Sequence, residues 1–256
     1  LILDGNNVAT GKFAGISTAD NDSNHNASHW LLDNVHVKNI PYSGSLGIEG
    51  GRGFYILGDD ITYINCHAYD NGFVGFWLRG YRHRVFGGSS HDGGDDGVDT
   101  WCDDLVISGM DVYNNAKYGI NPTGNLVNTN AHIGNAVGNV NLWLLSNHIY
   151  DNTEAAMAIN CAQNFWVMHN RCHSNGEGIN IGGCQVGYVS DNLVRDSGRG
   201  INLDLTEQSG NYRRTTDVHV NRNTLVNATT NIRISGVSGQ NISRIKITDN
   251  SLFSAT

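Results

Sequence analysis

The stretch Asp92-Gly93-Gly94-Asp95-Asp96-Gly97-Val98-Asp99-Thr100-Trp101 holds the densest group of carboxylates in the chain. From Gly97 it reads glycine, apolar, polar, any residue, polar. The same five-residue frame begins at Gly75 and at Gly119, 22 residues to either side. It recurs elsewhere from Gly15, Gly47, Ala156, Gly178, Gly200 and Asn231. The chain is therefore built from about nine repeats of one short unit.

A second column of sequence runs in step with the first and ends each time in asparagine. Its segments run from Ile61 to Asn65, Trp166 to Asn170, Tyr188 to Asn192, Val218 to Asn223 and Ile245 to Asn250. Two short strands at a fixed offset, with glycine and asparagine at the corners and only two prolines, favour a parallel β-helix. Helical repeats would need long runs with a period of 3.6. We therefore predict an all-β solenoid with about nine coils of about 22 residues.

The alternation of side chains along a strand predicts which residues face the core. The second and fourth residues of each frame point inward, and the third and fifth point outward. The predicted inward column is Ile48, Phe76, Val98, Ile120, Met157, Ile179, Ile201 and Ile232. Stacked coils lie about 4.8 Å apart, so outward residues of successive coils form one surface. The asparagines of the second column are expected to form an inner ladder of amides.

Length and composition favour one elongated domain over residues 1–256. With 256 residues and 39% hydrophobic content, the core is substantial, but the core of a solenoid grows along one axis. Because the chain begins and ends close to strand-like segments and solenoids need caps, we expect it to be part of a longer chain. Polar stretches at 19–29, 124–141 and 206–216 are expected to leave the stack as lateral loops.

The formal net charge of −8 argues against nucleic acid or an anionic membrane surface as a partner, because both require a basic surface. No apolar run approaches the roughly 20 residues of a membrane span. An acidic polysaccharide stays compatible with this charge, since Arg79, Arg82, His83 and Arg84 stand within six residues and can form a local basic patch. The alternative for this segment is a solvated rim of charge. The sequence leaves the oligomeric state open.

The five cysteines cannot all pair and are not spaced as a metal-binding set. Cys161 and Cys184 fall on successive predicted coils, so a disulfide between them is one interpretation. Buried thiols are the interpretation that we favour.

The outward ladder suggests a sugar-binding groove in the middle of the stack. Acids, a guanidinium group and two tryptophans on adjacent coils offer flat faces for pyranose rings, fixed hydrogen bonds for hydroxyl groups and charge. The predicted substrate-binding residues are Glu49, Trp77, Trp101, Lys117, Asn121 and Asn160.

Asp95, Asp96 and Asp99 are the candidates for chemistry. Three carboxylates this close cannot all stay ionised unless a cation joins them or one pKa rises. The first case predicts a calcium site formed by all three, and the second a general acid. The alternative is an ordinary solvated acidic turn.

Tyr118 lies one coil beyond Asp99 and is a second candidate for proton transfer. A tyrosine used as a base needs a nearby cation to depress its pKa, and Lys117 or Arg79 is placed to supply one. The alternative is a corner tyrosine that covers the core.

Two motifs carry a resemblance to known families. Asp95-Asp96-Gly97-Val98-Asp99 resembles the Asp-Asp-Gly-aromatic-Asp calcium motif of family 9 pectate lyases. Tyr118-Gly119-Ile120-Asn121-Pro122-Thr123 resembles the Tyr-Gly-Phe-Asp-Pro-His motif of mannuronan C5-epimerases. Asn121 stands where the epimerase motif has aspartate and where the lyase is expected to have its catalytic lysine, and Thr123 stands where the epimerase motif has histidine. Over nearly the whole chain, the resemblance implies a right-handed parallel β-helix that acts on polysaccharide.

Our leading hypothesis is an extracellular or secreted uronate lyase or C5-epimerase acting on an acidic glycan. In it, Asp95, Asp96 and Asp99 handle the cation or the sugar carboxylate, Arg79 neutralises charge and Tyr118 transfers a proton.

Two other hypotheses stay open. The first is an inverting hydrolase of the polygalacturonase type, which needs carboxyl groups roughly 6.5–9.5 Å apart. The second is a glycan-binding β-helix without catalysis, such as a tailspike or adhesin segment, which the absence of the lysine and histidine supports.

Overall fold

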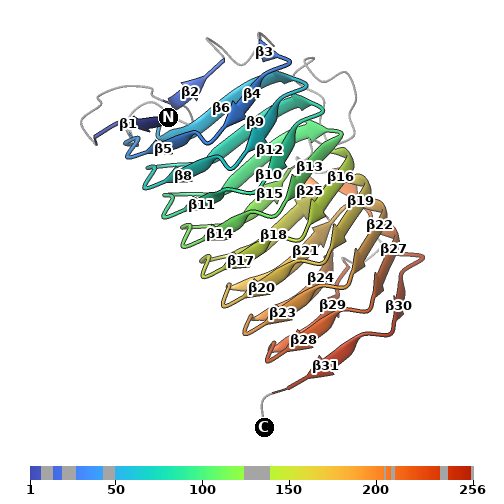
Figure 1. Cartoon of the computed structure of the whole chain (residues 1–256). Helices are drawn as coiled ribbons and strands as arrows, with labels where there is room; N and C mark the ends of the chain where they lie inside the picture. Colours follow the sequence, from blue (N-terminus) through green and yellow to red (C-terminus); the bar gives the residue numbers. More distant parts are fainter. Residues whose placement is uncertain are drawn as a thin grey trace.

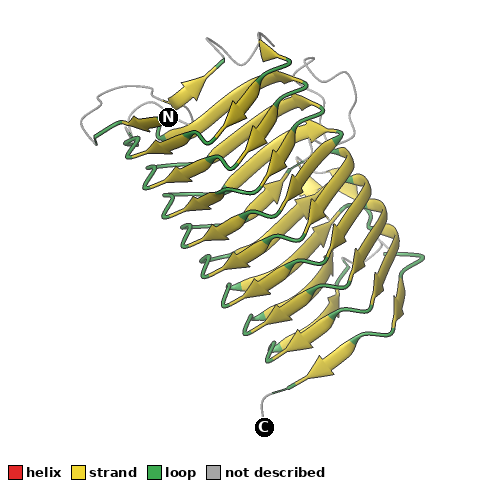
Figure 2. Cartoon of the chain, viewed as in Figure 1, coloured by secondary structure: helices red, strands yellow, loops and turns green. Residues whose placement is uncertain are grey.

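The computed structural model describes residues 1–6, 14–18, 27–42, 50–123, 139–204, 206–208, 211–236 and 242–254. These residues form strands and turns without a helix, and the strands of successive coils stack into three long parallel sheets (Figures 1 and 2). The predicted right-handed parallel β-helix is thereby confirmed. No helix of the described part could cross a membrane.

Each regular coil contributes one strand to each sheet in turn. The first sheet contains β2 (Ala14–Ser17), β6 (Arg52–Asp59), β9 (Phe76–Tyr81), β12 (Val98–Asp103), β15 (Ile120–Pro122), β18 (Ala155–Asn160), β21 (Glu177–Gly182), β24 (Arg199–Asp204) and β29 (Thr230–Ile234). The second contains β4 (Leu31–Asp33), β7 (Thr62–Ile64), β10 (Arg84–Phe86), β13 (Leu105–Ser108), β16 (Val140–Leu145), β19 (Gln163–Met168), β22 (Gln185–Ser190), β27 (Thr216–Asn221) and β30 (Lys246–Thr248). The third contains β1 (Ile2–Asp4), β5 (His36–Lys38), β8 (His67–Tyr69), β11 (Ser89–His91), β14 (Asp111–Tyr113), β17 (His148–Tyr150), β20 (Arg171–His173), β23 (Leu193–Arg195), β28 (Thr224–Val226) and β31 (Ser251–Phe253).

Three strands lie outside this pattern. β3 (Ala27–Ser28) pairs with β6 at the N-terminal end. β25 (Thr206–Gln208) and β26 (Asn211–Arg213) form an antiparallel hairpin within the insertion predicted at 206–216. The insertions predicted at 19–29 and 124–141 lie mostly outside the described residues. The second insertion ends earlier than predicted, because β16 already begins at Val140.

The inward column of the first sheet follows the prediction from β9 onward. Its fully buried members are Phe76, Val98, Ile120, Met157, Ile179 and Ile201, and Ile232 is partly buried against them. The prediction for the coil before β9 is wrong, because Phe54 pairs with Phe76 there and the frame begins at Gly53. Ile48 lies outside the described residues. The frame at Gly53 escaped detection because its outward residues, Tyr55 and Leu57, are apolar.

The predicted asparagine ladder is present on the inner side of the second column. The side-chain amide of Asn147 donates to Asn170, Asn170 to Asn192, Asn192 to Asn223 and Asn223 to Asn250, at 2.9–3.0 Å. A second ladder, which the sequence analysis did not identify, joins Asn115, Asn152 and Asn175. Asn65 does not belong to either ladder. It is an exposed corner residue with a φ of 47°, and the buried Cys66 follows it at the inner position.

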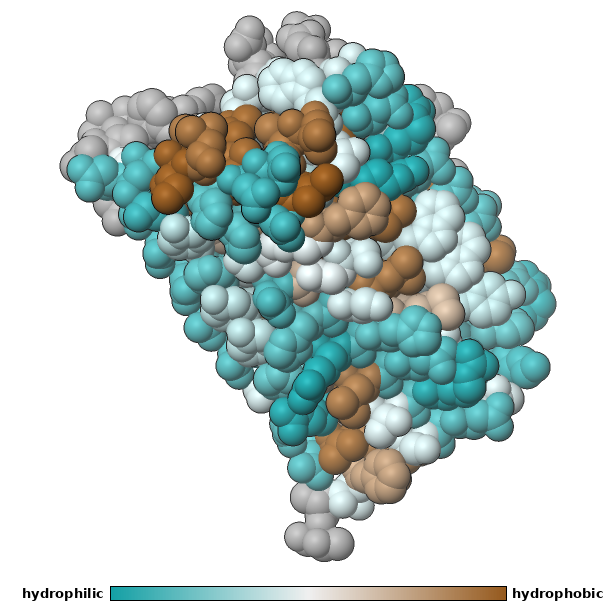
Figure 3. All heavy atoms as spheres, in the orientation of Figure 1, coloured by the Kyte–Doolittle hydropathy of each residue, from teal (hydrophilic) through white to brown (hydrophobic). Residues whose placement is uncertain are grey.

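The remaining features of the core agree with a stacked interior. All five cysteines are buried thiols, so Cys161 and Cys184 do not form a disulfide. Hydrophobic side chains come to the surface toward the two ends of the stack (Figure 3), among them Ile2 and Leu31 at one end and Leu252 at the other. Among the described residues, the coils at the ends of the stack have a neighbouring coil on one side only, and they bury less apolar surface for that reason.

Candidate functional site

The predicted site residues lie on the outward face of the first sheet, on β9, β12, β15 and the turns that precede them. The strand register places Asp99 between Trp77 and Asn121. Alternation along β12 then brings Trp101 beside Arg79 on β9. The prediction that these residues share one surface is correct.

Two further predicted residues lie at the margins of this surface. Asn160, at the end of β18, is bridged to Thr123, so it continues the row formed by Arg79 and Trp101. Glu49 lies outside the described residues, and Tyr55 is the residue that pairs with Trp77 in its place.

Trp77 does not offer a face to a sugar, contrary to the prediction. Its side chain is only 4% exposed and packs with Tyr55, Leu57 and Val74 in a small apolar cluster outside the coil. The Arg52 guanidinium carbon lies 3.3 Å from the centre of the indole. This cluster closes the outward face at β6 and β9, so the accessible surface begins at β12.

Arg79 is held between the two tryptophans. Its guanidinium carbon lies 4.5 Å from the ring centre of Trp77 and 4.2 Å from that of Trp101. Such cation–π contacts fix a planar cation while leaving its charge in place. Trp101 stays partly exposed, so the prediction that it stacks on a sugar depends on the part of its ring that Arg79 leaves open.

Asp99 is the carboxyl group best suited to acid–base chemistry. The residue is partly exposed, but its Oδ1 atom is shielded from solvent and has no hydrogen-bond partner within the described part of the chain. Burial is the largest cause of a rise in the pKa of Asp99 to about 7, and the negative charge of Asp96 adds to it. Arg79 acts in the opposite direction. Asp99 therefore exchanges its proton in the neutral pH range.

Asp96 is a buried and fully oriented carboxylate. It accepts hydrogen bonds from the Asn121 side-chain amide at 2.8 Å and from the Tyr118 backbone amide at 3.2 Å. The Thr123 hydroxyl donates to the side-chain Oδ1 of Asn121 at 2.9 Å and extends this chain of hydrogen bonds. Burial raises the pKa of Asp96 to about 6, although the hydrogen bond from Asn121 opposes the rise. Asp96 therefore positions the residues around it and contributes charge beside Asp99.

Two of the three carboxylates from which a calcium site was predicted are engaged by other side chains. Asp95 is buried and pairs with the Lys117 ammonium group at 2.6 Å, while Asp96 accepts a hydrogen bond from the Asn121 side chain. Across the described residues, no three His, Cys, Asp or Glu side chains are grouped so that they could hold a metal ion. Asp95 and Asp96 do not form the solvated acidic turn that was the alternative prediction, because each is at most 6% exposed.

The surroundings of Tyr118 keep its phenol protonated. Burial is the largest cause of a pKa well above that of an ordinary phenol, and a hydrogen bond with Glu154 raises it further. The cations expected to depress its pKa do not do so, since Lys117 pairs with Asp95 and the charges beside the phenol are acidic. Tyr118 is consequently protonated at neutral pH.

A hollow of about 350 Å³ opens beside Tyr118, at the start of β18 and β21. Its lining consists of Tyr118, Thr153, Glu154, Ala155, Gly176, Glu177 and Asn180. Glu177 accepts a hydrogen bond from Asn180 at 2.5 Å and pairs with Arg199 at 2.7 Å. The sequence analysis missed Glu154, Glu177 and Arg199. Glu177 stands just before its frame, where Asp96 and Tyr118 stand in theirs, and Glu154 stands one residue earlier, at the position of Asp95 and Lys117. These recurring positions were the available signal.

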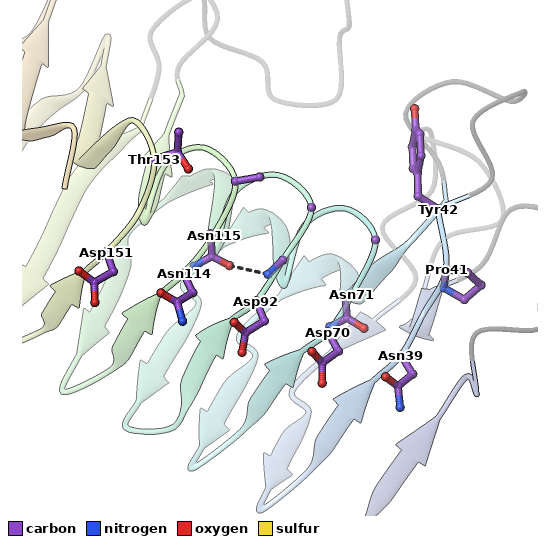
Figure 4. A pocket seen from close by; sticks show the side chains of 14 residues that line it. Asn39, Pro41, Tyr42, Asp70, Asn71, Asp92, Asn114, Asn115, Asp151 and Thr153 are labelled. Carbon is purple, nitrogen blue, oxygen red and sulfur yellow. Dashed lines mark hydrogen bonds between the residues drawn. The ribbon is translucent and has the colours of Figure 1, made fainter. Parts of the chain in front are cut away.

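A larger hollow of about 1010 Å³ lies at the corner between the third and first sheets, and Thr153 lines both hollows. Figure 4 shows the side chains of Asp70, Asp92, Asn114 and Asp151 in a row on successive corners. Each has a φ of 53–55°, a conformation that aspartate and asparagine adopt more readily than most residues. The row is thus explained by the turns, and we assign it no chemistry.

The fold and the site together define a parallel β-helix with a partly buried carboxyl group, a buried carboxylate and a guanidinium group on or beside its first sheet. Among solved structures, the chain is similar to the A-module of Azotobacter vinelandii mannuronan C-5 epimerase AlgE4, with a TM-score of 0.76 and 20% identity over 99% of this chain and 68% of that chain. It is also similar to the AlgE6 A-module of the same organism, with a TM-score of 0.54 and 17% identity over 99% of this chain and 71% of that chain. No family model and no curated protein sequence matches the chain. At this level of identity the comparison establishes the fold alone.

Proposed function

We propose that this protein acts on an acidic polysaccharide as a uronate C5-epimerase or lyase, on the outward face of β12 and β15. The observation that carries the proposal is Asp99, a partly buried carboxyl with a pKa of about 7. It lies one strand from Asn121 and is affected by the charge of Arg79. The similarity of the fold to modules titled as mannuronan C-5 epimerases supports this choice of substrate and reaction.

Both reactions begin with removal of the proton at C5 of a uronate. In its ionised form Asp99 takes this proton, and the electron pair moves into the sugar carboxylate. Arg79, fixed between two indoles, stabilises the negative charge that develops there.

Tyr118 completes either reaction as the acid. In epimerisation its phenol returns a proton to the opposite face of C5. In elimination the C4–O4 bond breaks, a double bond forms between C4 and C5, and the leaving oxygen takes the proton. Glu154, which is hydrogen-bonded to the phenol, orients it. This assignment places the base at Asp99 and not at Asn121, which has no basic group and is engaged with Asp96.

The products of alginate, pectate and a neutral glucan test the proposal. An epimerase changes the ratio of uronate epimers seen by NMR, and a lyase produces ultraviolet absorbance from an unsaturated uronate. Asp99→Asn is expected to reduce turnover by about 10²–10⁴-fold, the usual contribution of a general base. The matched control is Asp92→Asn, an exposed corner residue with a φ of 54°, which keeps full activity. New reducing ends without a double bond would identify an inverting hydrolase instead.

Glycan binding without catalysis is the second candidate. The hydrogen bonds from Thr123 to Asn121 and from Asn121 to Asp96 favour it, because this neutral chain stands where the epimerase motif has aspartate and histidine. In that case an acidic glycan binds, no product forms on long incubation, and Asp99→Asn changes affinity only.

A further inference from the structure

The outward face of the third sheet carries a ladder of stacked rings. Tyr69, His91, Tyr113, Tyr150 and His173 follow one another with ring centres 4.4–5.1 Å apart and planes within 11° of parallel. At the C-terminal end of the ladder, His148 of β17 meets His173 of β20 in a different way. Their planes are inclined by 43°, and their Nε2 atoms are 2.9 Å apart.

The outer nitrogen of each ring has an oxygen partner. Nδ1 of His148 lies 3.3 Å from a carboxylate oxygen of Asp111, and Nδ1 of His173 lies 3.3 Å from the hydroxyl of Ser174. Metal-binding histidines almost always place their second ring nitrogen against such an oxygen, which fixes the tautomer and the orientation of the ring. Here both Nε2 atoms are turned toward each other and away from these partners.

We propose that the Nε2 atoms of His148 and His173 together bind one divalent transition-metal ion, with water completing its coordination. Two nitrogens 2.9 Å apart, each at a typical bond length of about 2.0–2.1 Å from a shared ion, subtend an angle of about 90°. That angle belongs to neighbouring corners of a square-planar or tetragonal site, the geometry of Cu²⁺ and Ni²⁺ with nitrogen and oxygen ligands. The tetrahedral angle that Zn²⁺ adopts in most protein sites is wider. The site therefore selects Cu²⁺ first, in agreement with the general order of affinities.

Charge around the pair limits the affinity. Arg171 pairs with His148 in the sheet register, and Arg195 pairs with His173. Both guanidinium groups disfavour a cation, while Asp111 favours one. A site with two protein ligands binds a metal more weakly than a closed site with four. Two ligands agree with the finding that no three metal-binding side chains are grouped among the described residues.

Titration of the full chain with Cu²⁺, in a glycine buffer that competes with single histidines, tests the site. We expect one Cu²⁺ bound per chain, an electron paramagnetic resonance spectrum of a tetragonal ion with two imidazole nitrogens, and weaker binding of Zn²⁺. His148→Ala and His173→Ala each abolish this binding. Asp111→Asn, which leaves both ligands in place, weakens it by about tenfold or more.

His67→Ala is the matched control. His36 and His67 also lie on neighbouring strands of the third sheet, with ring centres 4.4 Å apart, and Nδ1 of His67 is bound to the Ser89 hydroxyl at 2.8 Å. Within the described residues, however, this pair makes no contact between ring nitrogens like the one that joins His148 and His173. This variant should keep the copper site. Circular dichroism verifies that each variant is folded. Binding that survives in folded His148→Ala and His173→Ala, or that His67→Ala removes, would overturn the proposal.

Discussion

Asp99 illustrates how much of a site is set by one residue and its neighbours. The period of two along β12 was sufficient to predict that Asp99 points outward, beside Trp77 and Asn121. The partial burial of Asp99 could not be predicted from the sequence, because it arises from groups contributed by other coils. Arg52, for example, covers Trp77 from the preceding coil. The outward residues of that coil are apolar, and its frame was therefore predicted to begin at the wrong glycine.

The pH dependence of stability tests the environment of Asp99. A raised pKa means that the folded protein holds this proton more tightly than the unfolded chain does. The stabilisation is thus complete below the unfolded pKa of about 3.9 and is lost as the pH rises through about 7. The Asp99→Asn variant has no such proton to lose, so its stability does not fall in this way. In denaturant unfolding we expect the free energy of unfolding of the variant to rise relative to that of wild type between pH 4 and pH 8, by on the order of 1–3 kcal/mol after allowance for solvent screening.

Asp96 also titrates in this range, but it is present in both proteins and its contribution cancels to first order. Asp92→Asn, at an exposed corner, should follow the wild-type curve. A stability difference between wild type and Asp99→Asn that is constant with pH, or that grows toward acid, would show that the folded protein does not hold the Asp99 proton more tightly.

At the scale of the elements, the asparagine ladder ties successive coils together. Asn170 is 1% exposed, donates to Asn192 and to two backbone carbonyl oxygens, and accepts from Asn147. Each coil thereby satisfies polar groups of the next coil inside the core, where water cannot replace them.

Asn170→Ala should lower the free energy of unfolding by at least about 2 kcal/mol, because it leaves several buried polar groups without a partner. Asn180→Ala is the control, since Asn180 occupies a partly exposed outward position on β21. Its effect should stay below about 1 kcal/mol. Equal losses in the two variants, measured by urea unfolding, would argue against a structural role for the ladder.

The sequence predicted strands well where the repeat is regular. From β9 to β24 an inward apolar residue recurs in every frame, and a glycine precedes it in every frame except the one that begins at Ala156. It failed where one of these signals was missing. Asn65 resembled a ladder residue by type and spacing, but it occupies a left-handed corner and Cys66 takes the inner place. The acids beside Tyr118 were missed for another reason. Glu154 is separated from Tyr118 by an insertion, so their closeness depends on stacking and not on spacing.

At the scale of the whole molecule, a stack of coils has stability that depends on the number of neighbours. Interior coils contact one coil on each side, and the end coils contact one only, where Leu252 and Ile2 are exposed. In such a one-dimensional array, local opening starts at the ends.

Native-state hydrogen exchange should therefore show a gradient of protection along the axis. We expect the slowest amide exchange in β12, β18 and β21 and the fastest in β1 and β31, with intermediate coils in order between them. Uniform protection, or a minimum at the central coils, would contradict a stack stabilised by nearest neighbours.

We propose that the outward face of β12 and β15 removes the C5 proton of a uronate, and this proposal is tested by following that proton. Polymannuronate and pectate are incubated in D₂O with wild type and with Asp99→Asn, and C5 is followed by NMR. We expect wild type to replace the C5 proton by deuterium in an epimer, or to remove it in forming an unsaturated end. We expect Asp99→Asn to do so at least about 10²-fold more slowly. Products that keep their C5 proton, no exchange with any uronan by the folded protein, or an unchanged rate in the variant would contradict it.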